Sequence, residues 1–105
     1  MTGKRSILEA ARVIRSKNSG PYELTLDIIF KDRRLFELFR RRRLITARKV
    51  AGLYGRPVSD VLRVVWFEPA HALKVTIRRP IPSGHPGETD IYGAQQHAPL
   101  LGIRW

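Results

Sequence analysis

The sequence contains no cysteine. This absence excludes disulfide bonds, thiolate catalysis and cysteine-based zinc sites. No apolar run approaches the roughly 20 residues that a membrane span needs. Glu9 and Arg12 interrupt the stretch that follows the basic N-terminus, so this stretch cannot form the apolar core of a signal peptide. We therefore expect a cytoplasmic protein with no membrane association.

Acidic residues are also scarce. The chain has 9 Asp and Glu residues against 20 Lys and Arg residues, which gives a net charge of +11. Such an excess predicts a polyanionic partner or a small acidic metabolite as ligand. The alternative is a compositional bias toward arginine together with an acidic partner protein. The sequence lacks the motifs of the common nucleic-acid-binding modules, which disfavours nucleic acid as the partner. The length of 105 residues and the 43% hydrophobic content predict one domain over residues 1–105.

The first third of the chain predicts a helix, a turn and a strand. Leu8, Ala11 and Ile14 recur at helical spacing, which indicates a short helix over residues 7–14. Residues 16–21 are turn formers and predict that the chain reverses there. Residues 23–30 alternate between apolar and mostly polar side chains, as expected for a strand with one fully apolar face.

Two helices and a hairpin are expected next. Asp32 is a predicted N-cap for a helix that ends at the run of four arginines, residues 40–43. Thr46 is a predicted N-cap for a second helix, with Gly55 at its C-terminal end. Residues 61–68 and 73–78 read as two strands of a hairpin.

The C-terminal part is rich in loop signals. Residues 80–87 contain three prolines and two glycines, which exclude regular structure there. Residues 88–99 are ambiguous between helix and loop, and residues 100–105 suit a short last strand. The whole order predicts an α+β fold, namely a ferredoxin-like antiparallel sheet with helices on one face and a loop-rich C-terminal tail.

The second face of this sheet is expected to be open. We place Thr25, Asp27 and Ile29 on it, together with Lys74, Thr76 and Arg78 of the hairpin. The strand over residues 61–68 is partly apolar on both sides, with Val61, Val65 and Phe67 on one and Leu62, Val64 and Trp66 on the other. The open face should therefore expose hydrophobic area, which usually marks a contact with a partner.

Three stretches of the sequence resemble a known family. They are VIRSKNSGP (residues 13–21) leading into TLDI, RPIPSG (residues 79–84) and GETDIYGAQQHAPLL (residues 87–101). Together they are similar to a small family that accompanies acyclic terpene utilisation (AtuA-type) proteins. The resemblance covers nearly the whole chain from about Ile7.

The resemblance implies that a large AtuA-type protein is the partner and carries most of the chemistry. It also implies that the chain is a detached version of the ferredoxin-fold domain found at the C-terminus of some AtuA-type proteins. In that domain a loop of the type R-S-G-x-K-G leads into the first strand. The RSKNSG stretch of residues 15–20 is similar, although Lys17 comes earlier than the lysine of the family loop.

Several polar residues are candidates for a substrate or anion site. Lys17, Asn18 and Gly20 offer a cation, an amide and backbone N–H groups that suit a phosphate or carboxylate. A plain turn stabilised by Asn18 explains the same residues. Asp27 is a candidate general base or a partner of Lys17, and a cross-strand ion pair with Lys74 or Arg78 is the simpler explanation.

The tail adds further candidates, namely Asp90, Gln95, Gln96 and His97. Amides and a histidine in a loop-rich segment are typical of binding sites, but they also satisfy the backbone of a proline-rich loop. The acids and histidines of this tail match no metal-ligand spacing, so we expect no metal and no other cofactor.

Three functions remain open on the sequence alone. The first is an accessory subunit that docks onto an AtuA-type protein and is not catalytic by itself. The second is an independent ligand-binding protein or small enzyme, although no catalytic residues can be named, since no nucleophile, base and orienting group share a motif. The third is a basic nucleic-acid-binding module, the least favoured of the three. Self-association into a homo-oligomer also stays open.

Overall fold

Strand β2 (Glu23–Phe30) has the most regular alternation of apolar and polar residues in the chain. The computed structural model describes residues 3–20, 22–78 and 97–105. In β2, Leu24, Leu26, Ile28 and Phe30 are all buried in one hydrophobic cluster. The predicted strand is confirmed over the same residues, because alternation places every apolar side chain of this face in the core.

The segment before β2 is a strand, and the predicted helix over residues 7–14 is wrong. A short 3-10 helix, η1 (Ile7–Glu9), leads into strand β1 (Ala11–Gly20), which pairs antiparallel with β2. The predicted turn over residues 16–21 is therefore also wrong for residues 16–20, and Pro21 lies outside the described residues. Pairing with an apolar neighbour outweighs the weak helical periodicity of so short a segment.

The central part of the chain forms two capped helices, as predicted. Helix α1 (Arg33–Arg41) starts at Asp32, whose Oδ1 accepts a hydrogen bond from the Leu35 N–H at 2.9 Å. Helix α2 (Ala47–Leu53) starts at Thr46, whose hydroxyl accepts from the Lys49 N–H at 3.2 Å. These caps satisfy backbone donors that a helix leaves unpaired at its first turn.

The hairpin of the second half consists of β3 (Val61–Phe67) and β4 (Ala72–Arg78), joined by the 3-10 helix η3 (Glu68–Ala70). A β-bulge between Val61 and Arg63 shifts the register of β3. Val61 consequently lies opposite Ile77 and packs against the core, not beside Val65 and Phe67 as the simple alternation predicted.

The four strands form one antiparallel sheet in the order β1-β2-β4-β3. Strands β2 and β3 are both antiparallel to β4, so they run parallel to each other and are connected through α1 and α2. This is a split β-α-β arrangement. The edge beside β2 is occupied by the N-terminal strand β1. The fold is thus α+β, while the complete ferredoxin-like topology is not confirmed.

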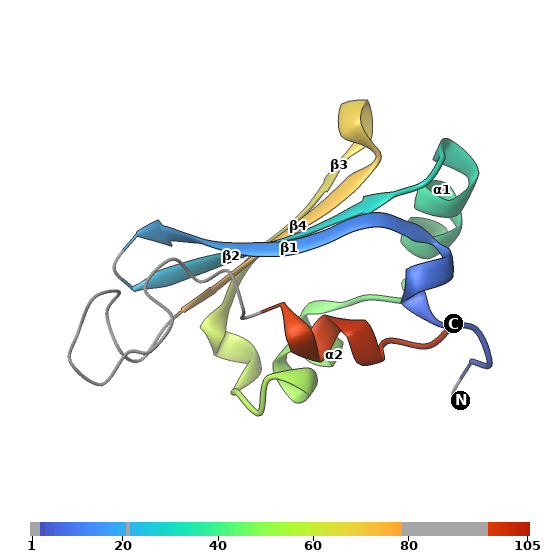
Figure 1. Cartoon of the computed structure of the whole chain (residues 1–105). Coiled ribbons are helices and arrows are strands. Elements are labelled where there is room, and N and C mark those ends of the chain that lie inside the picture. Colours follow the sequence, from blue (N-terminus) through green and yellow to red (C-terminus); the bar gives the residue numbers. More distant parts are fainter. Residues whose placement is uncertain (1–2, 21, 79–96) are drawn as a thin grey trace.

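The helices bury one face of this sheet. Phe36 and Phe39 of α1 and Val50 of α2 share the hydrophobic cluster with the inward residues of β2 and β4. Figure 1 shows α2 beneath the sheet and α1 at its right-hand end. No described helix is long and apolar enough to cross a membrane.

The C-terminal residues close the core. Residues 98–102 form a 3-10 helix, η4 (Ala98–Gly102), where a short strand over residues 100–105 was predicted. Only Arg104 keeps β character, in an isolated bridge with Ser6. Leu100 and Ile103 are buried in the common cluster, and the Trp105 indole N–H donates to the Ser6 carbonyl at 2.9 Å. The tail therefore ties the N-terminus to the sheet.

Gly55 and Gly52 give a matched pair of stability predictions. Gly55 follows α2 with a φ of +62°, whereas Gly52 lies within the helix, and an added Cβ meets no atom within 4 Å at either position. Gly55→Ala should cost about 1 kcal/mol of unfolding free energy because L side chains disfavour a left-handed backbone. Gly52→Ala should stabilise by about 0.5–1 kcal/mol through helix propensity. Urea denaturation measures both changes, and a shift of the same sign in both variants would contradict this account.

Candidate functional site

The face of the sheet opposite the helices carries side chains from all four strands, and we call it the outer sheet face. Its residues follow from the register of the strand pairs. They are Val13, Arg15, Lys17, Glu23, Thr25, Asp27, Ile29, Arg63, Val65, Phe67, Ala72, Lys74, Thr76 and Arg78. No described helix packs on this face, so the predicted open face is confirmed in the described part of the chain.

Asp27 lies at the centre of the outer sheet face. It is directly opposite Arg15 on β1 and Lys74 on β4. The Arg15 Nε donates to Asp27 Oδ2 at 3.0 Å. Asp27 is only 1% exposed, and its Oδ1 is buried with no hydrogen-bond partner. A buried carboxylate with one unpaired oxygen is costly and is unusual in a folded protein.

The predicted partners of Asp27 were Lys74 or Arg78, and the structure gives Arg15 instead. Arg15 was not predicted as a partner because residues 7–14 were predicted to form a helix and residues 16–21 a turn. Arg15 lies between these two segments, so no strand pairing was expected for it. The signal was present in β1, where Val13, Arg15 and Lys17 alternate with Ile14 and Ser16. This alternation is the period of a strand.

A polar row lies beside the Asp27 row. It runs from Lys17 through Thr25 and Thr76 to Arg63 across the four strands. The Arg63 Nη2 is 3.6 Å from the Glu23 carboxylate, and both side chains are substantially exposed. Such an exposed ion pair contributes little to stability. The row therefore presents cations to solvent at both edges of the sheet.

An apolar row lies on the other side of Asp27. It contains Val13, Ile29, Ala72 and Phe67. Phe67 is 43% exposed, and Val65, its neighbour on the same face of β3, is 44% exposed. The Lys74 Nζ lies 5.6 Å from the centroid of the Phe67 ring. This geometry is a cation–π contact, which holds the ammonium group beside exposed apolar surface.

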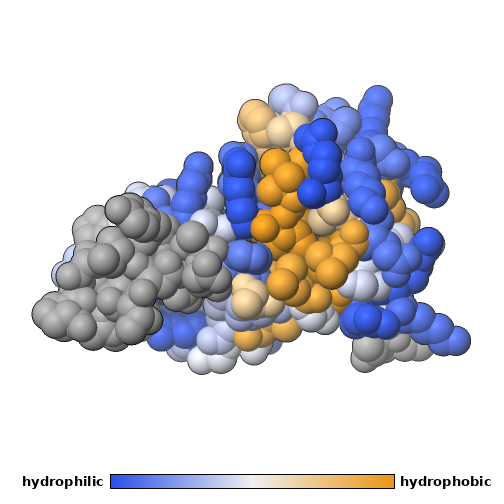
Figure 2. Space-filling view, viewed as in Figure 1, coloured by the Kyte–Doolittle hydropathy of each residue, from blue (hydrophilic) through white to orange (hydrophobic). Residues whose placement is uncertain are grey.

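The surface seen from the β1 edge has the same mixed character. Figure 2, viewed as Figure 1 with β1 in front, shows hydrophobic side chains gathered in one area. Hydrophilic side chains flank this area on both sides. Apolar area bordered by charges is typical of protein contact surfaces.

The structure separates the predicted site residues. Lys17 and Asp27 share the outer sheet face as diagonal neighbours, while Asn18 lies opposite Leu24 and faces the helix side. Gly20 ends β1, and His97 is the N-cap of η4. Asp90, Gln95 and Gln96 lie outside the described residues. The roles suggested for these residues in ligand binding stay predictions.

The outer sheet face offers positive charge and exposed apolar area for binding. The described residues contain no group of three or more His, Asp or Glu side chains that could hold a metal. Burial raises the pKa of the Tyr54 phenol above its usual range, which keeps its hydroxyl protonated. Asp27 is paired with a cation and has no second carboxylate or histidine across its strand pairs. A charged, partly apolar face with one anchored arginine can recognise an acidic surface.

Comparison with known proteins gives one match. The model of the family described as Domain of unknown function (DUF4387) matches residues 7–104. No curated protein and no solved structure matches the chain.

Proposed function

We propose that this chain, which belongs to the DUF4387 family, is an accessory subunit that docks onto a larger enzyme through its outer sheet face. The partner is a large AtuA-type protein of the cytoplasm, acting on carboxylic acids or isoprenoids. The resemblance of residues 13–21, 79–84 and 87–101 supports this partner. In this proposal the chain is a detached ferredoxin-like domain, and the large partner carries the catalytic residues.

One observation carries the proposal, namely the exposure of Val65 and Phe67 next to each other on the outer sheet face. Both lie on β3, an edge strand, where a partner can approach without displacing another strand. Burying the exposed part of each side chain contributes on the order of 1 kcal/mol. Exposed aromatic residues of this kind are often the anchors of an interface.

The charge of the outer sheet face selects the kind of partner. Arg15, Lys17 and Lys74 surround Asp27, which is buried and already paired, so the accessible charge is positive. An acidic surface complements this face and is attracted to it over several ångströms. A second copy of the chain would bring the same cations together, and the net charge of +11 disfavours that contact.

Asp27 acts in this proposal by positioning Arg15. The Arg15 Nε is held by the buried carboxylate at 3.0 Å, whereas the side chain as a whole is 55% exposed. Because Nε makes the only ion pair of Arg15 in the described structure, its two terminal nitrogens are available for a carboxylate of the partner. A guanidinium group that is fixed before binding loses less entropy on contact.

The proposal is tested by recovering the tagged chain from extract of its native cells. The extract is treated with nuclease and kept at moderate salt, and the bound proteins are identified by mass spectrometry. We expect an AtuA-type protein in near-stoichiometric amount. Mixing the two purified proteins should then give a complex. Its molar mass, measured by light scattering, should equal the combined masses of the two proteins in a whole-number ratio.

Two outcomes would contradict the proposal. One is recovery of the chain alone although the AtuA-type protein is present in the extract. The other is enzymatic activity of the isolated chain that the large protein does not change. Retention of nucleic acid that is lost steeply with added salt would favour the third candidate function instead.

A further inference from the structure

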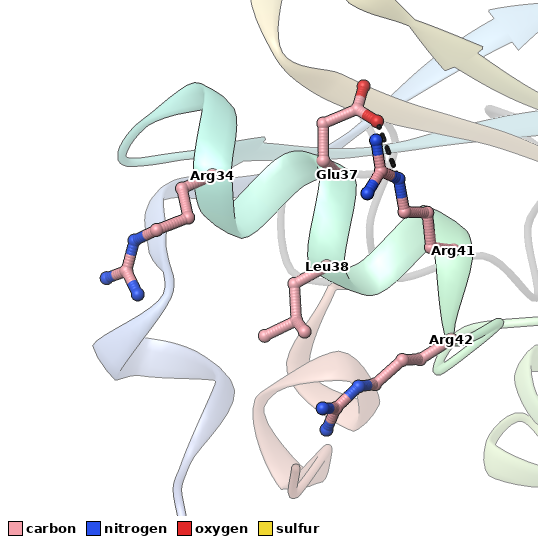
Figure 3. Close-up of a pocket in the computed structure, with 5 residues that line it drawn as sticks. All are labelled: Arg34, Glu37, Leu38, Arg41 and Arg42. Atoms are coloured by element: carbon pink, nitrogen blue, oxygen red, sulfur yellow. Dashed lines mark ion pairs between the residues drawn. The ribbon is translucent and has the colours of Figure 1, made fainter.

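A second surface feature lies on helix α1, away from the outer sheet face. It is a hollow of about 400 Å³ lined by Arg34, Glu37, Leu38, Arg41 and Arg42. Figure 3 shows Arg34, Leu38 and Arg42 pointing to the same side of the helix, toward the N-terminal segment and η4. Glu37 and Arg41 lie on the other side of the hollow, joined by an ion pair. The volume is within the range of small-molecule sites.

Helical geometry explains why Arg34 and Arg42 lie on the same side of α1. Arg34, Leu38 and Arg42 are spaced at i, i+4 and i+8, so they follow one face of the helix. Arg34 and Arg42 are about 12 Å apart along the axis, with Leu38 midway. The run of residues 40–43 does not form one cluster by itself, because consecutive residues point in different directions. Within this run, Arg42 lies on the same face of α1 as Arg34, which precedes it by about two helical turns.

The positive charge of this hollow is only partly neutralised. Glu37 accepts hydrogen bonds from Arg40 Nη2 at 2.9 Å and pairs with Arg41 Nε at 3.4 Å. Asp32 is occupied as the cap of α1. The side chains of Arg34 and Arg42 make no hydrogen bond or ion pair with any described residue. The guanidinium groups of Arg34 and Arg42 therefore lie on either side of the apolar Leu38, and neither is paired with an acidic side chain of the described residues.

We propose that this hollow binds a small dicarboxylate. One carboxylate of the ligand pairs with Arg34 and the other with Arg42, while the apolar chain between them lies on Leu38. A guanidinium group presents paired N–H donors that match the geometry of a carboxylate. Arginine side chains are long and flexible, so both guanidinium groups can turn toward a ligand that lies over Leu38.

Other anions fit the hollow less well. Inorganic phosphate satisfies one guanidinium group at a time and leaves Leu38 uncovered. A fatty monocarboxylate covers Leu38 and leaves one arginine without an anion. Only a ligand with acid groups at both ends of an apolar segment uses all three side chains. This inference does not depend on the docking of the outer sheet face, which lies on the opposite side of the sheet from α1.

The test is an NMR titration of the isotope-labelled full chain with succinate, glutarate and adipate at constant ionic strength. The Nε–Hε signals of Arg34 and Arg42 should shift and saturate. Because the contacts are solvent-exposed, we expect a Kd on the order of 1 mM for the best chain length. Hexanoate at the same carboxylate concentration should bind at least about fivefold more weakly.

Charge-matched variants separate a site from general attraction to a basic protein. Arg34→Gln and Arg42→Gln should each weaken binding by about fivefold, and the two together should abolish saturation. The control removes the same charge from α2 with Arg48→Gln and Lys49→Gln, two exposed positions, and should leave the Kd unchanged. Shifts that stay linear, that hexanoate reproduces, or that survive in the Arg34→Gln and Arg42→Gln double variant would overturn the proposal.

Discussion

Replacing Val65 and Phe67 by aspartate should weaken binding of the large partner by about a hundredfold or more. Both side chains lie on the outer sheet face and are 44% and 43% exposed. The change removes apolar contact area and places two negative charges where we expect an acidic partner surface. Like charges that meet across an interface oppose binding strongly.

Isothermal titration calorimetry with the purified partner measures this loss. The matched control is Leu8→Asp with Val58→Asp, since both residues are exposed and apolar and neither belongs to the outer sheet face. Circular dichroism and urea denaturation establish that both double variants remain folded. Equal affinities for the two double variants would show that the outer sheet face is not the docking surface.

Phe36→Ala should cost about 3–5 kcal/mol of unfolding free energy. Phe36 is fully buried, and its ring lies 6.2 Å from Phe30 and 5.8 Å from Trp66 in edge-to-face contacts. Truncation leaves a cavity where α1 meets both β2 and β3. A domain of this size has a total stability of about 5–15 kcal/mol, so a fifth or more of it would be lost.

Urea denaturation at 25 °C measures the effect of Phe36→Ala. Leu62→Ala is the control, because Leu62 is exposed on the edge strand and its truncation should cost less than about 1 kcal/mol. A change below 1 kcal/mol in Phe36→Ala would mean that α1 does not pack on the sheet as described.

The elements that the sequence predicts correctly carry their own local signals. Strand β2 alternates over its whole length, and α1 and α2 begin at Asp32 and Thr46, whose side chains accept hydrogen bonds from the first turn. Gly55, placed from the sequence at the end of α2, has a φ of +62°. Caps and positive-φ glycines are set by neighbouring residues, so one sequence is enough to find them.

Strand β1 could not be predicted in the same way. Its residues 11–14 have helical spacing, and residues 16–20 are turn formers. The segment forms a strand because it pairs with β2, the next strand in the sequence. Ser16, a turn former by its type, is buried opposite Leu26 within this ladder. Pairing with a neighbouring strand leaves only a weak trace in the sequence of the strand itself.

The candidate site shows the same division. Lys17 and Asp27 were placed on a common site from the sequence, and the register puts them on one face. Arg15 and the β-bulge near Val61 were missed, because the first depends on recognising β1 and the second on the pairing of β3 with β4. The hollow on α1 could have been found from the helical spacing of Arg34, Leu38 and Arg42.

The most direct test of docking through the outer sheet face is site-specific photocrosslinking in the native cells. A photoreactive phenylalanine analogue replaces Phe67 on the outer sheet face in one variant and Arg48 on α2 in another. We predict a crosslink to the large AtuA-type protein from position 67 and none from position 48. A crosslink from position 48 alone, or a complex that forms without any crosslink from position 67, would contradict the proposed docking surface.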